Sequence, residues 1–440
     1  MLSKVFAGFG IAMAFTGCVD EATDGGDEEL TSTEEMLSYS GFLPSGVPVF
    51  NSLGLSTTVS TAPQGRIDLT NEFFADLGTN DRRCVTCHLP TAGWTITPGQ
   101  MQAIFLLTNG GKIDDGLGLG AVFRTNDGSN TPNADVSTNA KRRAAYSMLL
   151  NRGTIRVGLP MPAGAEFELV SVDDPYGYAS AAELSMFRRP LPSSNLTLIK
   201  PVMWDGRVVG ATIPEALADQ SNGATMGHAQ ATEPLPQDTR LSIVALESSL
   251  FAAQTMTVGI GSLTAEGAKG GPEFLKTQAL VAARFNLFDT WATSTKAARQ
   301  AVFRGQELFN TRTRPTGGGA CRACHSAENS GTNVNGTFFN VGQSDGARRA
   351  ADQPLYVFRQ ISTGTEVSTT DPGRALITGK WADMNKFKAP SMRSLAARAP
   401  YFHGGTSKTL LEVVKFYETS LGFVFTAAEE QDMVAFLSAL

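Results

Sequence analysis

The chain has 440 residues, which is long enough for two or three domains, and its 45 glycines and 21 prolines indicate that much of it is loop. The formal net charge of −6 is concentrated in residues 19–40, which carry eight carboxylates and no lysine or arginine, so the rest is close to neutral. A protein that binds DNA or RNA needs a basic field to offset phosphate charge. This chain has none, which excludes nucleic acid as a partner.

Residues 1–17 predict a lipoprotein signal peptide. Lys4 precedes an apolar run of 12 residues, Val5–Thr16, whereas a bilayer span needs about 20. The run leads through Phe-Thr-Gly into Cys18, a sequence that resembles the bacterial lipobox, in which the cysteine is lipid-modified. We therefore expect Cys18 to be the lipid anchor and residues 18–45 to form an acidic tether. Ordinary cleavage that leaves a free thiol is the alternative.

Local patterns predict a helix, a loop and a hairpin in the N-terminal half. A short helix is expected over Leu69–Leu77, and residues 108–135, rich in glycine, asparagine and aspartate, are expected to form a loop. Two alternating runs, Thr154–Leu159 and Phe167–Val172, are separated by two prolines and a glycine, a pattern typical of a β-hairpin.

Three helices are expected in the C-terminal part. The first covers Ser294–Asn310. The last two begin at capping boxes, one made by Thr409 with Glu412 and the other by Thr426 with Glu429. Both carry apolar residues at helical spacing, which predicts one buried face on each.

Four of the five cysteines form two pairs, and a histidine directly follows each pair. The two segments are Cys84-Val-Thr-Cys87-His88 and Cys321-Arg-Ala-Cys324-His325. This C-x-x-C-H pattern is the c-type haem attachment site, in which two thiols bond one haem and the histidine reaches its iron. A zinc ribbon places its two cysteine pairs about 15–20 residues apart, but these pairs are more than 200 residues apart. A thioredoxin-like dithiol leaves both histidines unexplained. The sequence therefore predicts a dihaem cytochrome.

Together these patterns predict a mainly α, loop-rich fold with two cytochrome c-like haem domains. We expect the N-terminal domain at residues 46–290, with an inserted hairpin and loop region. The C-terminal domain is expected at residues 291–440.

Several stretches resemble the bacterial dihaem cytochrome c peroxidase and MauG superfamily. In that family's order they are the first haem motif, Met203-Trp204-Asp205-Gly206-Arg207, the second haem motif, and the segments 387–405, 409–417 and 427–437. The resemblance is nearly continuous in the C-terminal module. It is patchy in the N-terminal module, where roughly 120 residues separate the first haem motif from Trp204, and we interpret the excess as an insertion.

The resemblance implies that the haem of His88 reacts with peroxide and that the haem of His325 transfers electrons. At the sixth-ligand position of the second haem this chain has Tyr417, as MauG-like enzymes do, where classical peroxidases have a methionine. A thioether favours reduced iron and a phenolate favours oxidised iron. Met433 and Met392 are the alternative ligands, and Tyr417 as a plain core residue of its helix is the alternative interpretation.

The resemblance also implies residues that carry electrons and protons. Trp204 corresponds to the tryptophan that relays electrons between the haems, with a buried structural aromatic as the alternative. No histidine lies between His88 and His228, so the family's usual distal histidine is missing. The distal acid/base group is expected to be His228, followed by Gln220 and Glu233. A hydrogen-bonded structural role for His228 is the alternative.

His403 is expected to support a haem, by contact with a propionate, without binding iron. The resemblance implies a calcium ion between the haems, held partly by an asparagine ahead of the tryptophan motif. Here that place is taken by Arg189, and Asn195 matches a neighbouring asparagine. The carbonyls of Arg398 and Pro400 are the other candidate calcium ligands.

Three functions follow from the resemblance, in this order. The first is a MauG-like oxidase, in which hydrogen peroxide gives a high-valent state shared by both haems that oxidises a residue of a partner protein by long-range electron transfer. The second is a peroxidase that reduces hydrogen peroxide with electrons from a small cytochrome or cupredoxin. The third is a non-catalytic electron-transfer lipoprotein. All three predict two covalent haem c groups in a periplasmic or cell-surface lipoprotein of a Gram-negative bacterium, held at the outer membrane by its lipid alone.

Overall fold

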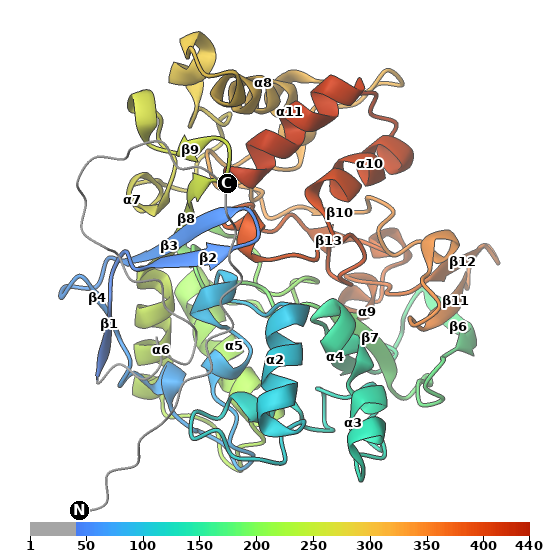
Figure 1. Cartoon of the computed structure of the whole chain (residues 1–440). Helices are drawn as coiled ribbons and strands as arrows, with labels where there is room; N and C mark the ends of the chain where they lie inside the picture. Colours follow the sequence, from blue (N-terminus) through green and yellow to red (C-terminus); the bar gives the residue numbers. More distant parts are fainter. Residues whose placement is uncertain (1–40) are drawn as a thin grey trace, which may run out of the picture.

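The computed structural model describes residues 41–440 (Figure 1). The predicted signal peptide, the lipid-anchor Cys18 and most of the predicted tether 18–45 lie outside the described residues and stay predictions. Within residues 41–440, no helix is long and apolar enough to cross a membrane.

The described chain is mixed α/β and rich in loops, so the expectation of a mainly α fold is wrong. Its strands are β1 (Phe42–Pro44), β2 (Pro48–Asn51), β3 (Gly54–Ser60), β4 (Arg66–Asp68), β5 (Ile155–Leu159), β6 (Phe167–Asp173), β7 (Leu184–Arg188), β8 (Leu250–Thr257), β9 (Gly261–Ser262), β10 (Phe338–Phe339), β11 (Leu355–Gln360), β12 (Glu366–Thr369) and β13 (Phe387–Lys388). Its helices are α2 (Pro98–Thr108), α3 (Asn139–Ala145), α4 (Ser147–Arg152), α5 (Ile213–Gly227), α6 (Gln237–Ser249), α7 (Pro272–Leu275), α8 (Ala297–Thr311), α9 (Ala375–Thr378), α10 (Leu410–Leu421) and α11 (Ala427–Ser438).

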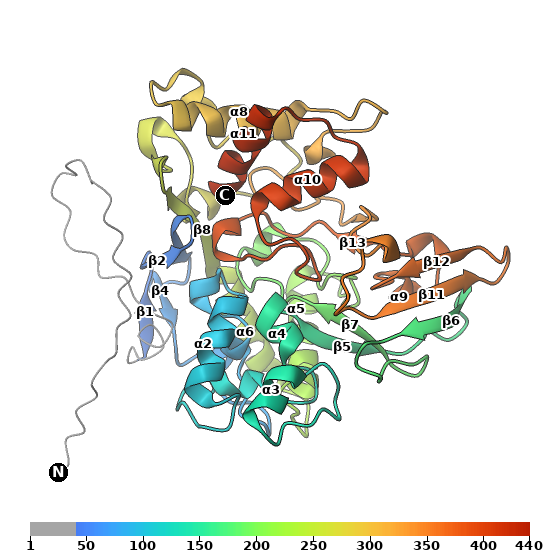
Figure 2. The same cartoon turned by 45° about the vertical axis from the view of Figure 1, so that its right-hand side comes forward.

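The strands of the described chain form small, separate sheets that are joined by long loops. Their orders are β2-β3-β8-β9, β12-β11-β6, and the pairs β1-β4, β5-β7 and β10-β13. Helices α8, α10 and α11 gather at one end of the molecule, and α2 to α6 gather at the other (Figure 1). The β12-β11-β6 sheet projects from the side of the molecule (Figure 2).

The two runs predicted to form a hairpin are both strands, but they do not pair with each other. β5 pairs with β7, and β6 pairs with β11, with Phe167 opposite Gln360 and Leu169 opposite Phe358. The rings of Phe167 and Phe358 are both buried and meet edge to face at 5.5 Å. The partner of β6 lies almost 190 residues further along the chain, so a local alternating pattern gives no sign of it.

The capped C-terminal helices are confirmed. α10 begins after Thr409, whose hydroxyl accepts the Glu412 amide at 3.1 Å, and α11 begins after Thr426, which exchanges both capping-box bonds with Glu429. α8 matches the helix predicted at 294–310 to within a few residues. The helix predicted at 69–77 is reduced to a single 3₁₀ turn, Glu72–Phe74.

α8 and α11 cross closely and form the core of the C-terminal end. A Cβ on Gly305 would lie 1.9 Å from the Asp432 carbonyl oxygen, so only glycine allows this approach. Phe436 packs edge to face against Phe285 at 5.4 Å. Residues 260–288 thus pack in the same cluster as α8 and α11. The domain boundary placed between residues 290 and 291 stays a prediction.

A buried group of charges ties β7 to the turn that carries Trp204. Arg188, the last residue of β7, donates two hydrogen bonds to Asp371, at 2.7 and 2.9 Å, and also bonds Asp205. All three side chains are at most 2% exposed. Arg207 adds a second positive charge on Asp205, at 3.1 Å. The carboxylates are thus matched by two guanidinium groups, as buried charges require.

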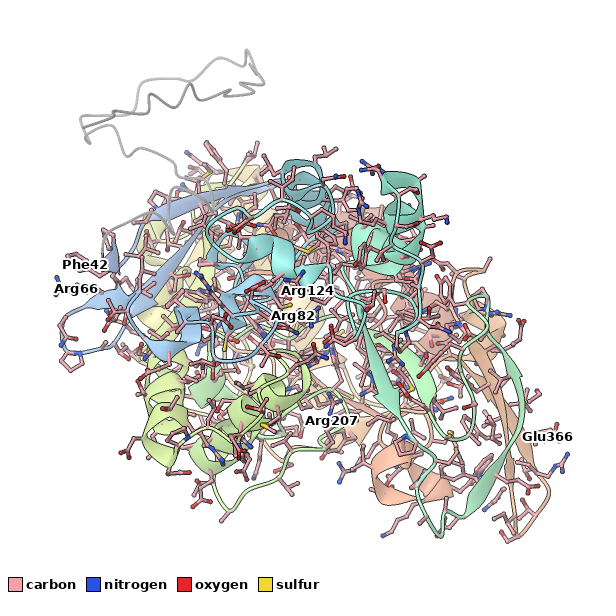
Figure 3. The ribbon with its side chains drawn as sticks, turned by 90° about the horizontal axis from the view of Figure 1, so that it is seen from below. Phe42, Arg66, Arg82, Arg124, Arg207 and Glu366 are labelled. Atoms are coloured by element: carbon pink, nitrogen blue, oxygen red, sulfur yellow. The ribbon has the colours of Figure 1, made fainter. Side chains whose placement is uncertain are left out.

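Substituting Asp371→Asn should lower the free energy of unfolding by about 3–5 kcal/mol, because it leaves the buried Arg188 charge incompletely paired. The matched control is Glu366→Gln. Glu366 pairs with Arg359 on the exposed surface of the projecting sheet, far from this cluster (Figure 3). An exposed pair contributes at most about 1 kcal/mol. Chemical denaturation of the two purified variants measures the difference, and equal losses would contradict this assignment.

Candidate haem sites and the residues between them

A cavity of about 170 Å³ opens beside the first C-x-x-C-H motif. The 3₁₀ turn η2 (Cys84–Thr86) carries the motif, and Cys84, Cys87 and His88 all line the cavity. The α5 and α6 helices and the segment 188–194 supply nearly half of the other lining residues.

The His88 ring is oriented by a backbone carbonyl. Its Nδ1 lies 3.1 Å from the Trp94 carbonyl oxygen, and the Phe73 ring packs 6.3 Å away. Burial lowers the pKa of His88 to about 4, so the imidazole is neutral near pH 7. A proton on Nδ1 directed at a carbonyl leaves Nε2 as the free nitrogen, the tautomer that an iron ligand needs.

The second motif repeats this arrangement beside a larger cavity of about 590 Å³. The His325 Nδ1 lies 2.5 Å from the Gly331 carbonyl oxygen, and the Phe309 ring packs 5.9 Å from the imidazole. Burial lowers the pKa of His325 as well. Cys321 and Cys324 line the same cavity.

The chemistry of both cavities fits haem c. Burial raises the pKa of the Cys87 thiol to about 11 and that of Cys321 to about 12, so these thiols stay protonated and are poor ligands for a bare metal ion. Thioether attachment to a haem removes that ionisation altogether. The described residues also hold no cluster of three or more His, Cys, Asp or Glu side chains suited to a metal ion. Bound haem would be attached by the four motif cysteines and ligated by His88 and His325.

Trp204 lies between the two cavities and lines both of them. Its Nε1 donates to the Arg189 carbonyl at 2.8 Å, and its own carbonyl accepts the Lys388 amide at 3.0 Å. The strip shared by both cavities also includes residues 190–192 and Ser391. The sequence prediction of a tryptophan between two haem pockets is therefore compatible with this placement.

His403 lines neither cavity. Its ring stacks on Phe387 at 4.1 Å and meets Trp204 edge to face at 6.2 Å. Its Nε2 lies 3.6 Å from an Asp371 carboxylate oxygen. Burial lowers its pKa to about 4. This places His403 behind Trp204, in the buried charge cluster, and the expected propionate contact stays a prediction.

Tyr417, on α10, lines the second cavity. Burial raises the pKa of its phenol, and the nearby Cys321 and Cys324 thiols add to the shift. Within residues 41–440 its hydroxyl makes no hydrogen bond to another side chain or carbonyl. Met392 and Met433 line this cavity too. A phenol with no internal partner is available to a bound group.

Met392 is placed differently from Tyr417. A Cβ on Gly331 would lie 2.6 Å from the Met392 sulfur, so this methionine packs against the residue that holds His325. It therefore lies on the side of the proximal histidine. Met433 belongs to α11 and packs in the cluster that includes Phe309, whose ring also contacts His325.

Of the three predicted distal residues, His228 and Gln220 line the first cavity, and Glu233 does not. Glu233 is exposed beyond the end of α5, so the structure does not bring it to the site. His228 caps the C-terminus of α5, and its Nδ1 is hydrogen-bonded to Asp127.

Asp127 holds His228 and is itself held by Arg82, with which it forms a buried ion pair. Burial opposes ionisation of Asp127, but the charges of Arg82 and His228 outweigh it and hold the carboxyl pKa below its usual range. The labels of Arg82 and Arg124 stand side by side in the view from below (Figure 3), and the Arg82 side chain is buried. With Nδ1 engaged by Asp127, the His228 Nε2 is left to take up and return a proton.

Sequence reasoning missed Asp127 because it lies in a loop segment with no periodic pattern. It also missed Glu247, a nearly buried carboxyl on α6 that lines the first cavity. Burial raises the pKa of Glu247 to about 7, and a hydrogen bond with Ser193 only partly offsets this shift. Glu247 follows Ile243 by four residues on the buried face of α6, and a charged residue at such a position is the signal that could have found it.

Comparison with known proteins identifies the family. No family model matches the chain. It is 29% identical over 279 residues to cytochrome-c peroxidase IdrP2 of Denitromonas iodatirespirans, covering 60% of this chain and 70% of that protein. It is 23% identical over 276 residues to methylamine utilization protein MauG of Methylophilus methylotrophus, covering 59% and 70%. The chain belongs to the dihaem cytochrome c peroxidase/MauG family. Family membership makes it a haem c enzyme that acts on peroxide.

Two further comparisons cover less or align less well. Cytochrome-c peroxidase IdrP1 of Denitromonas iodatirespirans is 32% identical over 173 residues, so the chain spans less than half of that relative, 44% of its length. The solved structure of a MauG-like protein associated with microbial copper homeostasis aligns with 60% of this chain and 76% of its own, at 19% identity and a TM-score of 0.34.

Replacing both cysteines of one motif should remove one haem and keep the other. In the Cys84→Ser/Cys87→Ser variant and in the Cys321→Ser/Cys324→Ser variant, covalent haem per chain should fall by half, because each motif attaches its own haem. Intact-mass spectrometry and a haem assay of each purified protein measure this ratio. A single-motif variant with unchanged covalent haem would contradict the assignment of that motif.

His228→Gln should slow the reaction of the holoprotein with peroxide by about 10²–10⁴-fold, the usual contribution of a positioned acid/base group. Asp127→Asn should slow it in the same direction, because the ring then loses its fixed orientation. Asp81→Asn, which changes an exposed carboxylate paired with Arg124 nearby, is the control and should leave the rate unchanged. Stopped-flow absorbance at the haem bands measures all three.

A different result would move the proton-transfer role to another residue. If His228→Gln keeps the wild-type rate and Glu247→Gln loses it, the acid/base group is the buried carboxyl of α6.

Proposed function

We propose that this protein is a MauG-like member of its family: it takes two oxidising equivalents from hydrogen peroxide and uses them to oxidise a residue of a partner protein at a distance. Hydrogen peroxide gains two electrons and two protons and leaves as two waters, and the partner supplies the electrons. Bound haem supplies the redox chemistry and stores the oxidising equivalents. We also propose that the chain carries two haem c groups, one in each cavity.

The observation that carries this proposal is the placement of Tyr417. Its side chain lines the second cavity together with Cys321 and Cys324, and its hydroxyl has no hydrogen-bond partner in the described part of the chain. A phenolate ligand stabilises oxidised iron, whereas a thioether stabilises reduced iron. A second haem held by Tyr417 would therefore keep an oxidising equivalent, which suits oxidation of a partner without prior reduction.

The position of Trp204 supports the proposal that oxidising equivalents are shared between the two cavities. Its indole lines both, and its Nε1 bond to the Arg189 carbonyl fixes the ring in one orientation. The buried Arg188 cluster holds the Asp205 turn that follows. A rigid indole between the two cavities gives electrons a path from one cavity to the other. The partner protein does not have to enter either cavity.

The first cavity supports proton handling at the peroxide. His228, oriented by Asp127, presents Nε2 as a group that can accept one proton and return it. Gln220 adds an amide that can hydrogen-bond a bound oxygen. No pocket shaped to the partner's side chain is needed when oxidation proceeds by long-range electron transfer.

A second candidate function is reduction of peroxide with electrons from a small cytochrome or cupredoxin. One observation favours it: several of the curated relatives are named as cytochrome c peroxidases. A periplasmic or cell-surface location at the outer membrane belongs to the same proposal, as does the lipid anchor at Cys18.

Titration of the purified diferric holoprotein with hydrogen peroxide, without reductant, should give a persistent state oxidised by two equivalents that changes the optical and EPR signals of both haems. In Trp204→Phe the change should be confined to the first haem and should decay faster. Tyr417→Met should raise the reduction potential of the second haem and make the peroxide reaction depend on prior reduction. Trp381→Phe is the control, since Trp381 lines neither cavity and packs near Phe167.

The alternative functions give other results. A wild-type protein that reacts only after one-electron reduction is a classical peroxidase, and Tyr417 is then not the ligand. A wild-type spectrum that peroxide leaves unchanged would contradict both enzyme functions and leave an electron carrier.

A further inference from the structure

Arg189 is a buried cation at the junction of the two cavities. It directly follows β7, lies in the strip that lines both cavities, and is 5% exposed. Its guanidinium donates to three backbone carbonyls from three separate segments: Nη1 to Arg152 at 3.0 Å, and Nη2 to Ile96 at 2.7 Å and to Arg398 at 2.9 Å.

No carboxylate faces this guanidinium within the described residues, which sets it apart from its neighbour Arg188. Arg188 is paired with two carboxylates, but the ion pairs found in residues 41–440 include none for Arg189. Burial, together with the nearby Arg398 charge, lowers the pKa of Arg189 to about 9, so it is still protonated at neutral pH. The charge is therefore held by carbonyl dipoles alone.

Carbonyl oxygens that converge from several segments are the kind of ligand that calcium uses, but calcium sites have six to eight oxygens and bring carboxylates with them. Of the positions considered for calcium, one is Arg189 itself, and the Arg398 carbonyl and the Asn195 amide already have hydrogen-bond partners. The Arg398 carbonyl, one of the oxygens offered to calcium by the sequence, accepts from Arg189. The Asn195 amide exchanges two hydrogen bonds with Ala252 of β8, both at 3.0 Å. While Arg189 occupies the junction, the residues present therefore do not fit a calcium ion.

We propose that the guanidinium of Arg189 is the resident cation of this junction and that it stands in place of a calcium ion. It joins the segment after the first haem motif, through Ile96, to the C-terminal module, through Arg398. At the same time its own carbonyl holds the Trp204 indole. Because the cation is part of the chain, the junction between the cavities stays assembled without a divalent ion. This inference rests on family membership and not on the identity of the electron donor.

The first test is calcium analysis of the wild-type holoprotein, purified without chelator, by elemental mass spectrometry. We expect substoichiometric calcium. Addition of EGTA or of millimolar calcium should change neither the optical and EPR spectra of the haems nor the thermal midpoint. One calcium ion per chain, whose removal by EGTA alters the spectra or the midpoint, would overturn the proposal. No peroxide is used, so this outcome is independent of the proposed enzyme function.

The second test uses Arg189→Ala, which removes the cation and leaves the three carbonyls facing an empty space. We expect its thermal midpoint to fall by on the order of 5 °C and to recover partly in millimolar calcium, and we expect Arg189→Lys, which keeps the charge, to fall less. If Arg189→Ala does not accumulate, the comparison is made with Arg189→Lys alone, which should stay insensitive to calcium.

The matched control is Arg393→Ala. Arg393 is equally buried and also donates to two backbone carbonyls, those of Asn329 and Gly271, both at 3.3 Å, but it lines neither cavity. Its loss should lower the midpoint without any response to calcium. An Arg189→Ala protein that is as insensitive to calcium as Arg393→Ala would overturn the proposal, because the three carbonyls would then not form a cation site.

Discussion

Two adjacent arginines, Arg188 and Arg189, fix the position of Trp204 between the two cavities. Neighbouring residues of an extended chain point to opposite sides, and here Arg188 reaches Asp205 and Asp371 while Arg189 reaches only backbone carbonyls. The first arginine fixes the turn that carries Trp204, and the carbonyl of the second accepts the Trp204 indole hydrogen. The position of that ring, and with it any electron transfer between the cavities, depends on both.

The two cavities position their motif histidine in the same way and differ in the other side chains that line them. In each, a backbone carbonyl takes the Nδ1 hydrogen of the motif histidine, and this leaves Nε2 for iron. The first cavity adds a group able to move protons, His228 held by Asp127. The second adds the phenol of Tyr417, which has no hydrogen-bond partner among residues 41–440. The two cavities therefore differ in the polar groups that they offer to a bound molecule.

The inserted segment of the N-terminal half joins the C-terminal half through its strands. β6 adds to β11 and β12 to make the projecting sheet (Figure 2), and Arg152, next to β5, pairs with Asp352. These contacts bind two parts of the chain that meet at Trp204. A protein that passes electrons between cofactors gains from such stiffness, because transfer depends on a fixed separation.

Features encoded in short stretches could be predicted before the fold was known: both C-x-x-C-H motifs, the capped helices α10 and α11, and the family that the motifs indicate. Tyr417 and Trp204 could be nominated because the short segments that contain them, Met203–Arg207 and residues 387–417, resemble the family. Contacts between residues far apart in the chain are visible only in the folded molecule. It pairs β6 with β11 instead of β5, brings Asp127 to His228, and leaves Glu233 in solvent. The β6–β11 pairing and the Asp127–His228 contact join residues about 100 or more positions apart, and no local periodicity records them.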